Sequence, residues 1–150
     1  MDGVLVAENN LRIGSVAPAF FTVAANGQGL VVGLALRVKA DGTQVYEPLA
    51  NYDAMQNKLI ARTIDLGPEG ERVFLVLFGT GIRNRSTQRA VSVKVGEVDT
   101  SVLFAGAQGD LVGVDQVNVE LPRSLMGRGE VGINLTVDKF SANTVTVTIR

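Results

Sequence analysis

Three residue types are missing from this 150-residue sequence: cysteine, histidine and tryptophan. Without cysteine there is no disulfide, no thiolate metal site and no cysteine nucleophile. Without histidine there is no Ser-His-Asp triad, no imidazole base and no histidine-ligated zinc. Composition thus excludes many common catalytic machineries, and we expect a non-catalytic chain with no catalytic residue, no cofactor and no bound metal.

An excess of charge of one sign is also missing. The 14 Lys and Arg side chains nearly balance the 15 Asp and Glu side chains, which gives a net charge of −1. No long-range field therefore favours nucleic acid or an anionic membrane surface as a partner. No stretch of about 20 consecutive apolar residues is present, so we expect no membrane insertion. The first residues lack the basic and apolar regions of a secretion signal, and the signal of an exported parent protein would lie outside this segment.

What the sequence does contain is a series of β-branched runs. Its 46% hydrophobic content suits one compact core. In residues 91–95, 115–121 and 143–149, aliphatic residues alternate with polar ones, as in strands with one buried face. Gly-containing turns separate these runs. The pattern predicts an all-β fold, an immunoglobulin-like antiparallel β-sandwich of about ten strands with little or no helix.

Three segments nearer the N-terminus predict local structure. Asp41-Gly42, between apolar runs, is a strong signal for a β-hairpin. Residues 53–58 are compatible with a short helical turn, but strand-like composition resumes at residue 59, which favours a reversal between two strands. Residues 72–78 form a continuous apolar run, which predicts a central strand covered on both faces.

The loop after this central strand begins with Gly79-Thr80-Gly81, which resembles the start of a dinucleotide-binding fingerprint. Asn84 occupies the position of the third glycine. Another strand follows within a few residues, where the fingerprint requires a helix whose N-terminus holds pyrophosphate. The segment therefore predicts a strand-to-strand loop and not a nucleotide site.

The same loop carries a basic cluster, Arg83, Arg85 and Arg89. Guanidinium groups form forked hydrogen bonds with phosphate, sulfate or acidic sugars, so the cluster is a candidate site for an anionic ligand. The alternative is structural pairing with an internal carboxylate such as Glu69 or Glu71, and we favour it.

Several carboxylates further along the chain, Asp99, Asp110, Asp115 and Glu120, suggest a calcium site or a glycosidase pair. Their spacing is too sparse for a calcium loop, and spacing across separate strands does not identify an acid and base. Ordinary β-turn residues are the favoured interpretation. Asp110 and Asp115 remain, with the three arginines, the candidate ligand- or partner-binding residues.

Several motifs together resemble a known family. They comprise residues 17–22, 26–29, 76–84 and 102–109 and the block Gly113-Val-Asp-Gln-Val-Asn-Val-Glu-Leu-Pro122. Over nearly the whole chain these motifs resemble the uncharacterised Solibacter C-terminal domain family of large exported acidobacterial proteins. The resemblance implies that residues 1–16 correspond to the last strands of a preceding immunoglobulin-like unit and that residues 17–150 form the sandwich domain. It supplies no catalytic residues.

The resemblance implies a secreted or cell-surface module that acts as a spacer, for display, or in binding a protein or polysaccharide. One alternative is a secretion or anchoring domain. Another is an accessory lobe of a carbohydrate-active or other hydrolytic enzyme, with a carboxylate site near Asp110 and Asp115. Expected partners are the neighbouring domains of the parent protein. Residues 4–13 predict a hairpin that either folds back on its own domain or pairs with a second chain in a strand-swapped homodimer.

Overall fold

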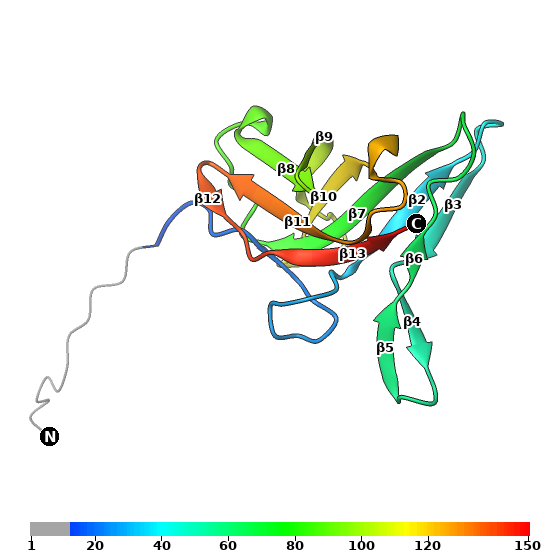
Figure 1. Ribbon diagram of the computed structural model, residues 1–150. Helices are drawn as coiled ribbons and strands as arrows, with labels where there is room; N and C mark the ends of the chain where they lie inside the picture. The colour runs from blue at the N-terminus through cyan, green and yellow to red at the C-terminus, as the bar shows by residue number, and fades with distance from the viewer. Residues whose placement is uncertain (1–12) are drawn as a thin grey trace, which may run out of the picture.

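A computed structural model describes residues 13–150 (Figure 1). The predicted all-β, sandwich-like fold is confirmed, since the helical segments in this described part are two 3₁₀ turns, η1 (Gln88–Ala90) and η2 (Arg123–Leu125). None of the helical segments in residues 13–150 is long and apolar enough to cross a membrane. The predicted hairpin of residues 4–13 lies outside the described residues except for Ile13, so both its placement and the strand-swapped dimer stay predictions.

The strands form one large curled sheet and one small sheet. In the large sheet the order is β3-β2-β7-β10-β9-β8-β11-β13-β6, with β1 on β7 and β12 on β11, while β4 and β5 pair only with each other. All pairings are antiparallel except that of β13 with β6. The strands are β1 (Ala19–Phe20), β2 (Gly33–Val38), β3 (Gln44–Pro48), β4 (Ala50–Asp53), β5 (Lys58–Ala61), β6 (Thr63–Ile64), β7 (Arg72–Thr80), β8 (Val91–Val95), β9 (Val98–Ala107), β10 (Asp115–Glu120), β11 (Gly129–Val137), β12 (Phe140–Ser141) and β13 (Val145–Ile149).

Strand β9 joins the two layers of the curled sheet. One layer contains β3, β2, β7 and β10, and the other contains β8, β11, β13 and β6. Its first residues pair with β8 and its later residues pair with β10. The register against β10 shifts between Asn118 and Val119, an irregularity of the kind that bends a strand. The spatial order β7-β10-β9-β8 is a Greek key, which is common in β-sandwiches. On the opposite side, the N–H of Val31 donates to the carbonyl of Thr146 in β13, so the chain before β2 contacts the far layer.

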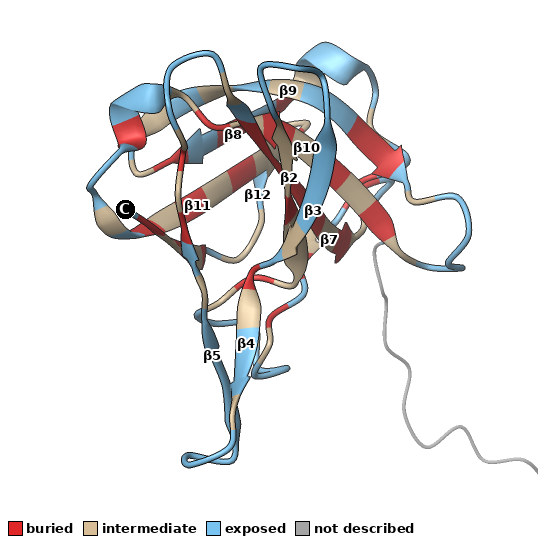
Figure 2. Cartoon of the chain, turned by 90° about the vertical axis from the view of Figure 1, so that its right-hand side faces the viewer, coloured by how far each residue is buried: buried red, intermediate tan, exposed pale blue. Residues whose placement is uncertain are grey.

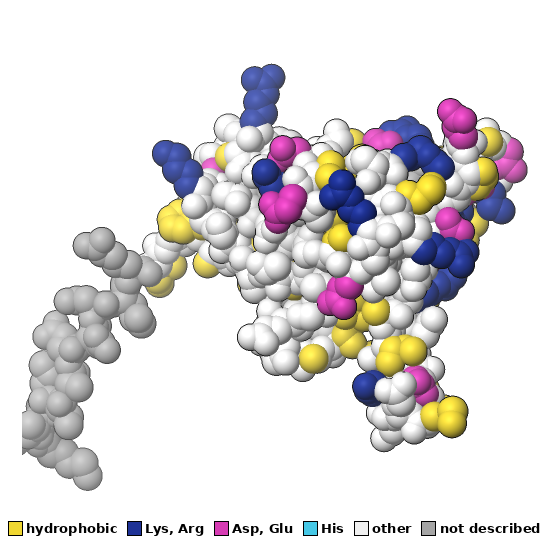
Figure 3. Space-filling model, in the orientation of Figure 1, with side chains coloured by type: hydrophobic (Ala, Val, Ile, Leu, Met, Phe, Trp, Pro, Cys, Tyr) yellow, Lys and Arg dark blue, Asp and Glu magenta, His cyan; other side chains and the backbone are white. Residues whose placement is uncertain are grey.

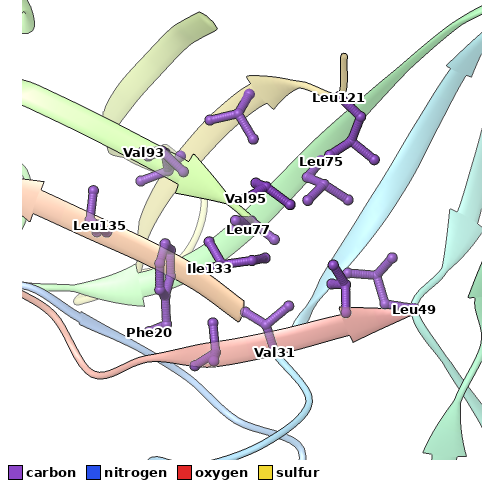
Figure 4. Close-up of a cluster of buried hydrophobic side chains, with 14 of the residues drawn as sticks. Phe20, Val31, Leu49, Leu75, Leu77, Val93, Val95, Leu121, Ile133 and Leu135 are labelled. Carbon is purple, nitrogen blue, oxygen red and sulfur yellow. The ribbon is translucent and has the colours of Figure 1, made fainter. Parts of the chain in front are cut away.

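The core lies between the two layers, where the inward-pointing residues, every second residue along most strands, pack against one another (Figure 4). Leu75 and Leu77 of β7 face Ile133 of β11 across this space, and all three are fully buried. Burying one such side chain stabilises the fold by about 1.5–3 kcal/mol. The central strand was predicted correctly, because Phe74 and Val76 on the outer face of β7 are also only 8% exposed.

Candidate functional site

The predicted basic loop is anchored to the sheet by Asp115. The side chain of Asp115 is 1% exposed and accepts the backbone N–H groups of Ile82 and Arg83 at 2.7 and 3.1 Å. The Nε of Arg83 donates to the same carboxylate at 2.5 Å, and its Nη2 donates to the carbonyl of Val114. Two of the predicted site residues therefore meet, but their polar groups are used to hold the loop to the start of β10.

The other predicted site residues do not join this pair. Arg85 donates to Gln88 within its own loop, and Arg89 lies exposed in η1. Asp110 is exposed, and within residues 13–150 it forms no ion pair.

The favoured structural pairing with an internal carboxylate is confirmed for Arg83, but its partner is Asp115 and neither of the suggested Glu69 and Glu71. Glu71 binds Arg37, 34 residues away, and Arg83 takes Asp115 as its partner. The other carboxylates are also separated, since Glu120 binds Arg72 and Asp99 lies 3.7 Å from Lys94. Across the part of the chain that the structure describes, no three acidic side chains gather closely enough to hold a metal ion.

The segment Gly79-Thr80-Gly81 has a packing role. Strand β1 pairs antiparallel with the end of β7 there, and the N–H of Ala17 donates to the carbonyl of Gly81 at 3.1 Å. A Cβ atom at Gly79 would overlap the carbonyl oxygen of Ala19, and one at Gly81 would overlap that of Ala17. These glycines let two backbones approach, which explains the fingerprint-like spacing without a nucleotide. The predicted strand-to-strand loop is confirmed.

Asn143 is a structural residue that the sequence analysis missed. Its Oδ1 accepts the N–H of Phe20, and its Nδ2 donates to the carbonyls of Phe20 and Gly27. The side-chain amide thus holds β1 and the following loop to the C-terminal strands. The partners are more than 100 residues apart in the chain, so no local pattern could have indicated this contact.

A charged cleft of about 520 Å³ is lined by residues of β2, β3, β6 and the loop before β7. Arg37 lies at its centre and donates to Glu47 at 2.7 Å, to Glu71 at 3.0 Å and to the carbonyl of Asp65 at 2.7 Å. The bond to Glu47, followed by the bond to Glu71, raises the pKa of Arg37. Three arginines and three carboxylates line the cleft, so it carries no net charge: Arg37, Arg62, Arg150, Glu47, Asp65 and Glu71.

The carboxylates of this cleft accept hydrogen bonds from neighbouring arginines and backbone N–H groups. The N–H of Gly67, and then the guanidinium of Arg150, hold the pKa of Asp65 below its usual range. Asp65 is therefore ionised at neutral pH and is not a proton donor, which is what a general acid would have to be. The contacts of Arg37 in this cleft link β2 to β3 and to the loop between β6 and β7.

The most prominent surface feature is the hairpin of β4 and β5, which stands away from the body (Figures 1 and 2). The predicted reversal between two strands is confirmed here. Ala50 pairs with Ala61 and Tyr52 with Leu59, so these four apolar residues share one face. Tyr52 is 63% exposed and Leu59 is 51% exposed. The apolar face of the hairpin is therefore largely exposed to solvent and is not covered by the rest of the domain.

Side-chain hydrogen bonds hold the turn of the hairpin. The side chain of Asp53 accepts the N–H groups of Met55 and Gln56, which satisfies the backbone of the turn. Asn57 has a φ of 51° and accepts a hydrogen bond from the Tyr52 hydroxyl. Met55 projects from the tip and is 98% exposed. The turn therefore exposes the apolar side chain of Met55 to solvent at the tip of the hairpin.

The base of the hairpin is fixed in the core. Leu49, immediately before β4, is 2% exposed and lies among the buried side chains of Figure 4. The N–H of Arg62, immediately after β5, donates to the carbonyl of Leu49 at 2.8 Å. Both ends of the hairpin therefore meet at a point that Leu49 attaches to the core.

A cleft of about 420 Å³ lies between β5 and the loop of residues 23–30. Val23, Ala24 and Leu30 form one wall, and Lys58 and Leu59 form the other. Figure 3 shows hydrophobic side chains at the tip of the hairpin and where it joins the body. We call the hairpin and this cleft together the hairpin site; Leu59 belongs to both.

Comparison of the chain with protein-family models, with curated proteins and with solved structures finds no match. The resemblance to the Solibacter C-terminal domain family therefore stays a prediction. Function has to be inferred from the hairpin site and the charged cleft.

Proposed function

We propose that this chain is a non-catalytic β-sandwich module of a larger exported protein, and that it binds another protein through the hairpin site. The observation that carries the proposal is the open apolar face of the projecting hairpin, formed by Ala50, Tyr52, Leu59 and Ala61. Contiguous exposed apolar surface on a folded domain marks an interaction site, whereas isolated exposed apolar residues do not.

A protein partner suits this face better than a polysaccharide. Sugar rings stack on aromatic platforms, and the hairpin offers a single ring, that of Tyr52, beside aliphatic Leu59 and Met55. Aliphatic surface gains its binding energy by excluding water against other apolar side chains. Polysaccharide binding is therefore an outcome for the test and not the proposal.

An accessory role in a hydrolytic enzyme finds less support. Such a role would call for a carboxylic acid that holds its proton near neutral pH, and the pKa of Asp65 is lowered instead. Asp115 accepts three hydrogen bonds from the loop above it, which leaves its carboxylate little capacity for a substrate. A secretion or anchoring role is a separate alternative, and it predicts loss of surface display when the domain is deleted.

Photo-crosslinking from the hairpin tip tests the proposal. A Met55→p-benzoylphenylalanine variant, incubated with the cell-surface fraction of the producing organism, is expected to form protein adducts. Excess unlabelled protein should suppress these adducts, and the variant Tyr52→Ser/Leu59→Ser should not. The matched control is Val112→p-benzoylphenylalanine, because Val112 is as exposed as Met55. Adducts with polysaccharide, or equal yields from positions 55 and 112, would contradict the proposal.

A further inference from the structure

We propose that Asn26 is a site of spontaneous covalent modification, where the asparagine deamidates through a succinimide, and that Thr22 controls the rate through its hydrogen bond with Gly27. The modification needs only water and is independent of what the hairpin site binds. Three features of this turn point to it: the sequence Asn26-Gly27, the exposure of Asn26, and the hydrogen bonds that hold Gly27.

The reaction joins two groups that are already neighbours in the chain. The main-chain nitrogen of Gly27 attacks the side-chain carbon Cγ of Asn26 and forms a C–N bond. The side-chain amide leaves as ammonia and takes with it the proton that the Gly27 nitrogen gives up. Water then opens the cyclic succinimide at either carbonyl, so the product is aspartate or isoaspartate. The net change is the uptake of one water molecule and the release of one ammonia molecule.

Asn26 is the one asparagine of this sequence that precedes a glycine. A side chain on the following residue would hinder the approach of its nitrogen to Cγ, and glycine has no such side chain. Asn26 is also exposed, so water reaches the succinimide and ammonia leaves without obstruction. Both the sequence and the surroundings therefore favour the reaction at this residue over the other asparagines.

In the folded turn, hydrogen bonds hold both reacting groups. The N–H of Gly27 donates to Oγ1 of Thr22 at 3.0 Å, and Oδ1 of Asn26 accepts the N–H of Gln28 at 3.0 Å. The attack requires the Gly27 nitrogen to lose its proton and turn toward Cγ, which breaks the bond to Thr22. Thr22 is only 6% exposed and forms a β-bridge with Val31, so its hydroxyl is fixed in place. The fold therefore slows the reaction.

A second contact holds the other side of Gly27. Nδ2 of Asn143 donates to the carbonyl of Gly27 at 2.8 Å, while Oδ1 of Asn143 accepts the N–H of Phe20. Gly27 cannot rotate into the geometry of attack while its N–H and its carbonyl are both bound. The reaction thus waits for local openings of the turn, which are more frequent than global unfolding.

The isoaspartate product would reshape the turn. Its main chain passes through the side chain of residue 26 and is one carbon atom longer, which displaces Gly27 from Thr22 and Asn143. Val23 and Leu30, on either side of this turn, line the cleft beside Leu59. The modification is irreversible because ammonia is lost, so an altered wall of the hairpin site would accumulate with the age of the protein.

Peptide mapping by mass spectrometry, on the purified protein incubated in mildly alkaline buffer, tests the proposal. Asn26 is expected to convert to aspartate and isoaspartate, and Asn26→Gln should remove this signal. Thr22→Val removes the acceptor and should raise the rate about fivefold, which corresponds to the loss of one hydrogen bond. Thr22→Ser keeps the hydroxyl and is the matched control, with a rate close to that of the wild type. Equal rates in these two variants would overturn the control by Thr22.

The same measurement in urea separates this effect from general unfolding. The unfolded wild type and both Thr22 variants should react at one common rate, above that of the folded wild type. A folded wild type that reacts as fast as the unfolded chain, or an Asn26 that stays unmodified in both, would overturn the proposal. Hydrogen exchange at the core amides of Leu75 and Ile133 should be alike in Thr22→Val and Thr22→Ser. If it is instead faster in Thr22→Val in proportion to deamidation, unfolding is the cause and the control by Thr22 is rejected.

Discussion

Replacement of Asp115 with alanine is expected to lower the free energy of unfolding by about 3–5 kcal/mol. Ile82 is fully buried, so its N–H would lose its acceptor without gaining water. Arg83 would lose both its backbone and its Nε contact to the same carboxylate. Since total stabilities are about 5–15 kcal/mol, this would be a large fraction of the whole.

Urea unfolding measures this loss directly, and Asp110→Ala is the matched control. Asp110 is exposed in the loop that leads to Asp115, and a change there should stay within about 0.5 kcal/mol. Asp115→Asn keeps an acceptor oxygen but removes the charge, so an intermediate loss is expected. If Asp115→Ala and Asp110→Ala unfold at the same urea concentration, Asp115 does not anchor the loop.

The second large effect is expected from Gly81→Ala, with a loss of about 2–5 kcal/mol. Gly81 has a φ of +71°, which is unfavourable for alanine, and the added Cβ would overlap the carbonyl of Ala17. Strand β1 would have to move off the end of β7, which would expose the buried ring of Phe20.

Gly127→Ala separates the two causes. Gly127 has a similar φ of +77°, but no atom lies within 4 Å of the position its Cβ would take. This control should therefore lose only the backbone contribution, on the order of 1 kcal/mol. Hydrogen exchange at the amides of Ala17 and Phe20 should speed up in Gly81→Ala alone. Equal losses in the two variants would show that the close approach of β1 contributes little.

The strands of the core could be predicted because the order of apolar and polar residues within each strand indicates which side chains are buried. Val91, Val93 and Val95 alternate with exposed residues in β8, as the sequence pattern indicates. The hairpin of β2 and β3 was likewise predictable, because Asp41-Gly42 is a local signal and Gly42 has a φ of +83°. These features depend on neighbours within a few residues.

The contacts that shape the candidate site join residues far apart in the chain. The partners of Arg37 are 10 to 34 residues away, and Asp115 binds a loop more than 30 residues earlier. The clustering of arginines after the central strand predicted pairing with an internal carboxylate, but not which carboxylate. The reversal at β4 and β5 was also predictable. Its projection into water was not, because that depends on whether the body covers Tyr52 and Leu59.

Excision of the hairpin tests the central claim most directly. Residues 51–60 are replaced with Asn-Gly, a two-residue turn that can join Ala50 to Ala61. Thermal unfolding and competition for the photo-adducts are then measured on the same sample. If the hairpin is a contact element, the midpoint stays within about 4 °C of the wild type while the excess excised protein no longer competes for the photo-adducts. Loss of cooperative unfolding, or competition that survives the excision, would contradict this account.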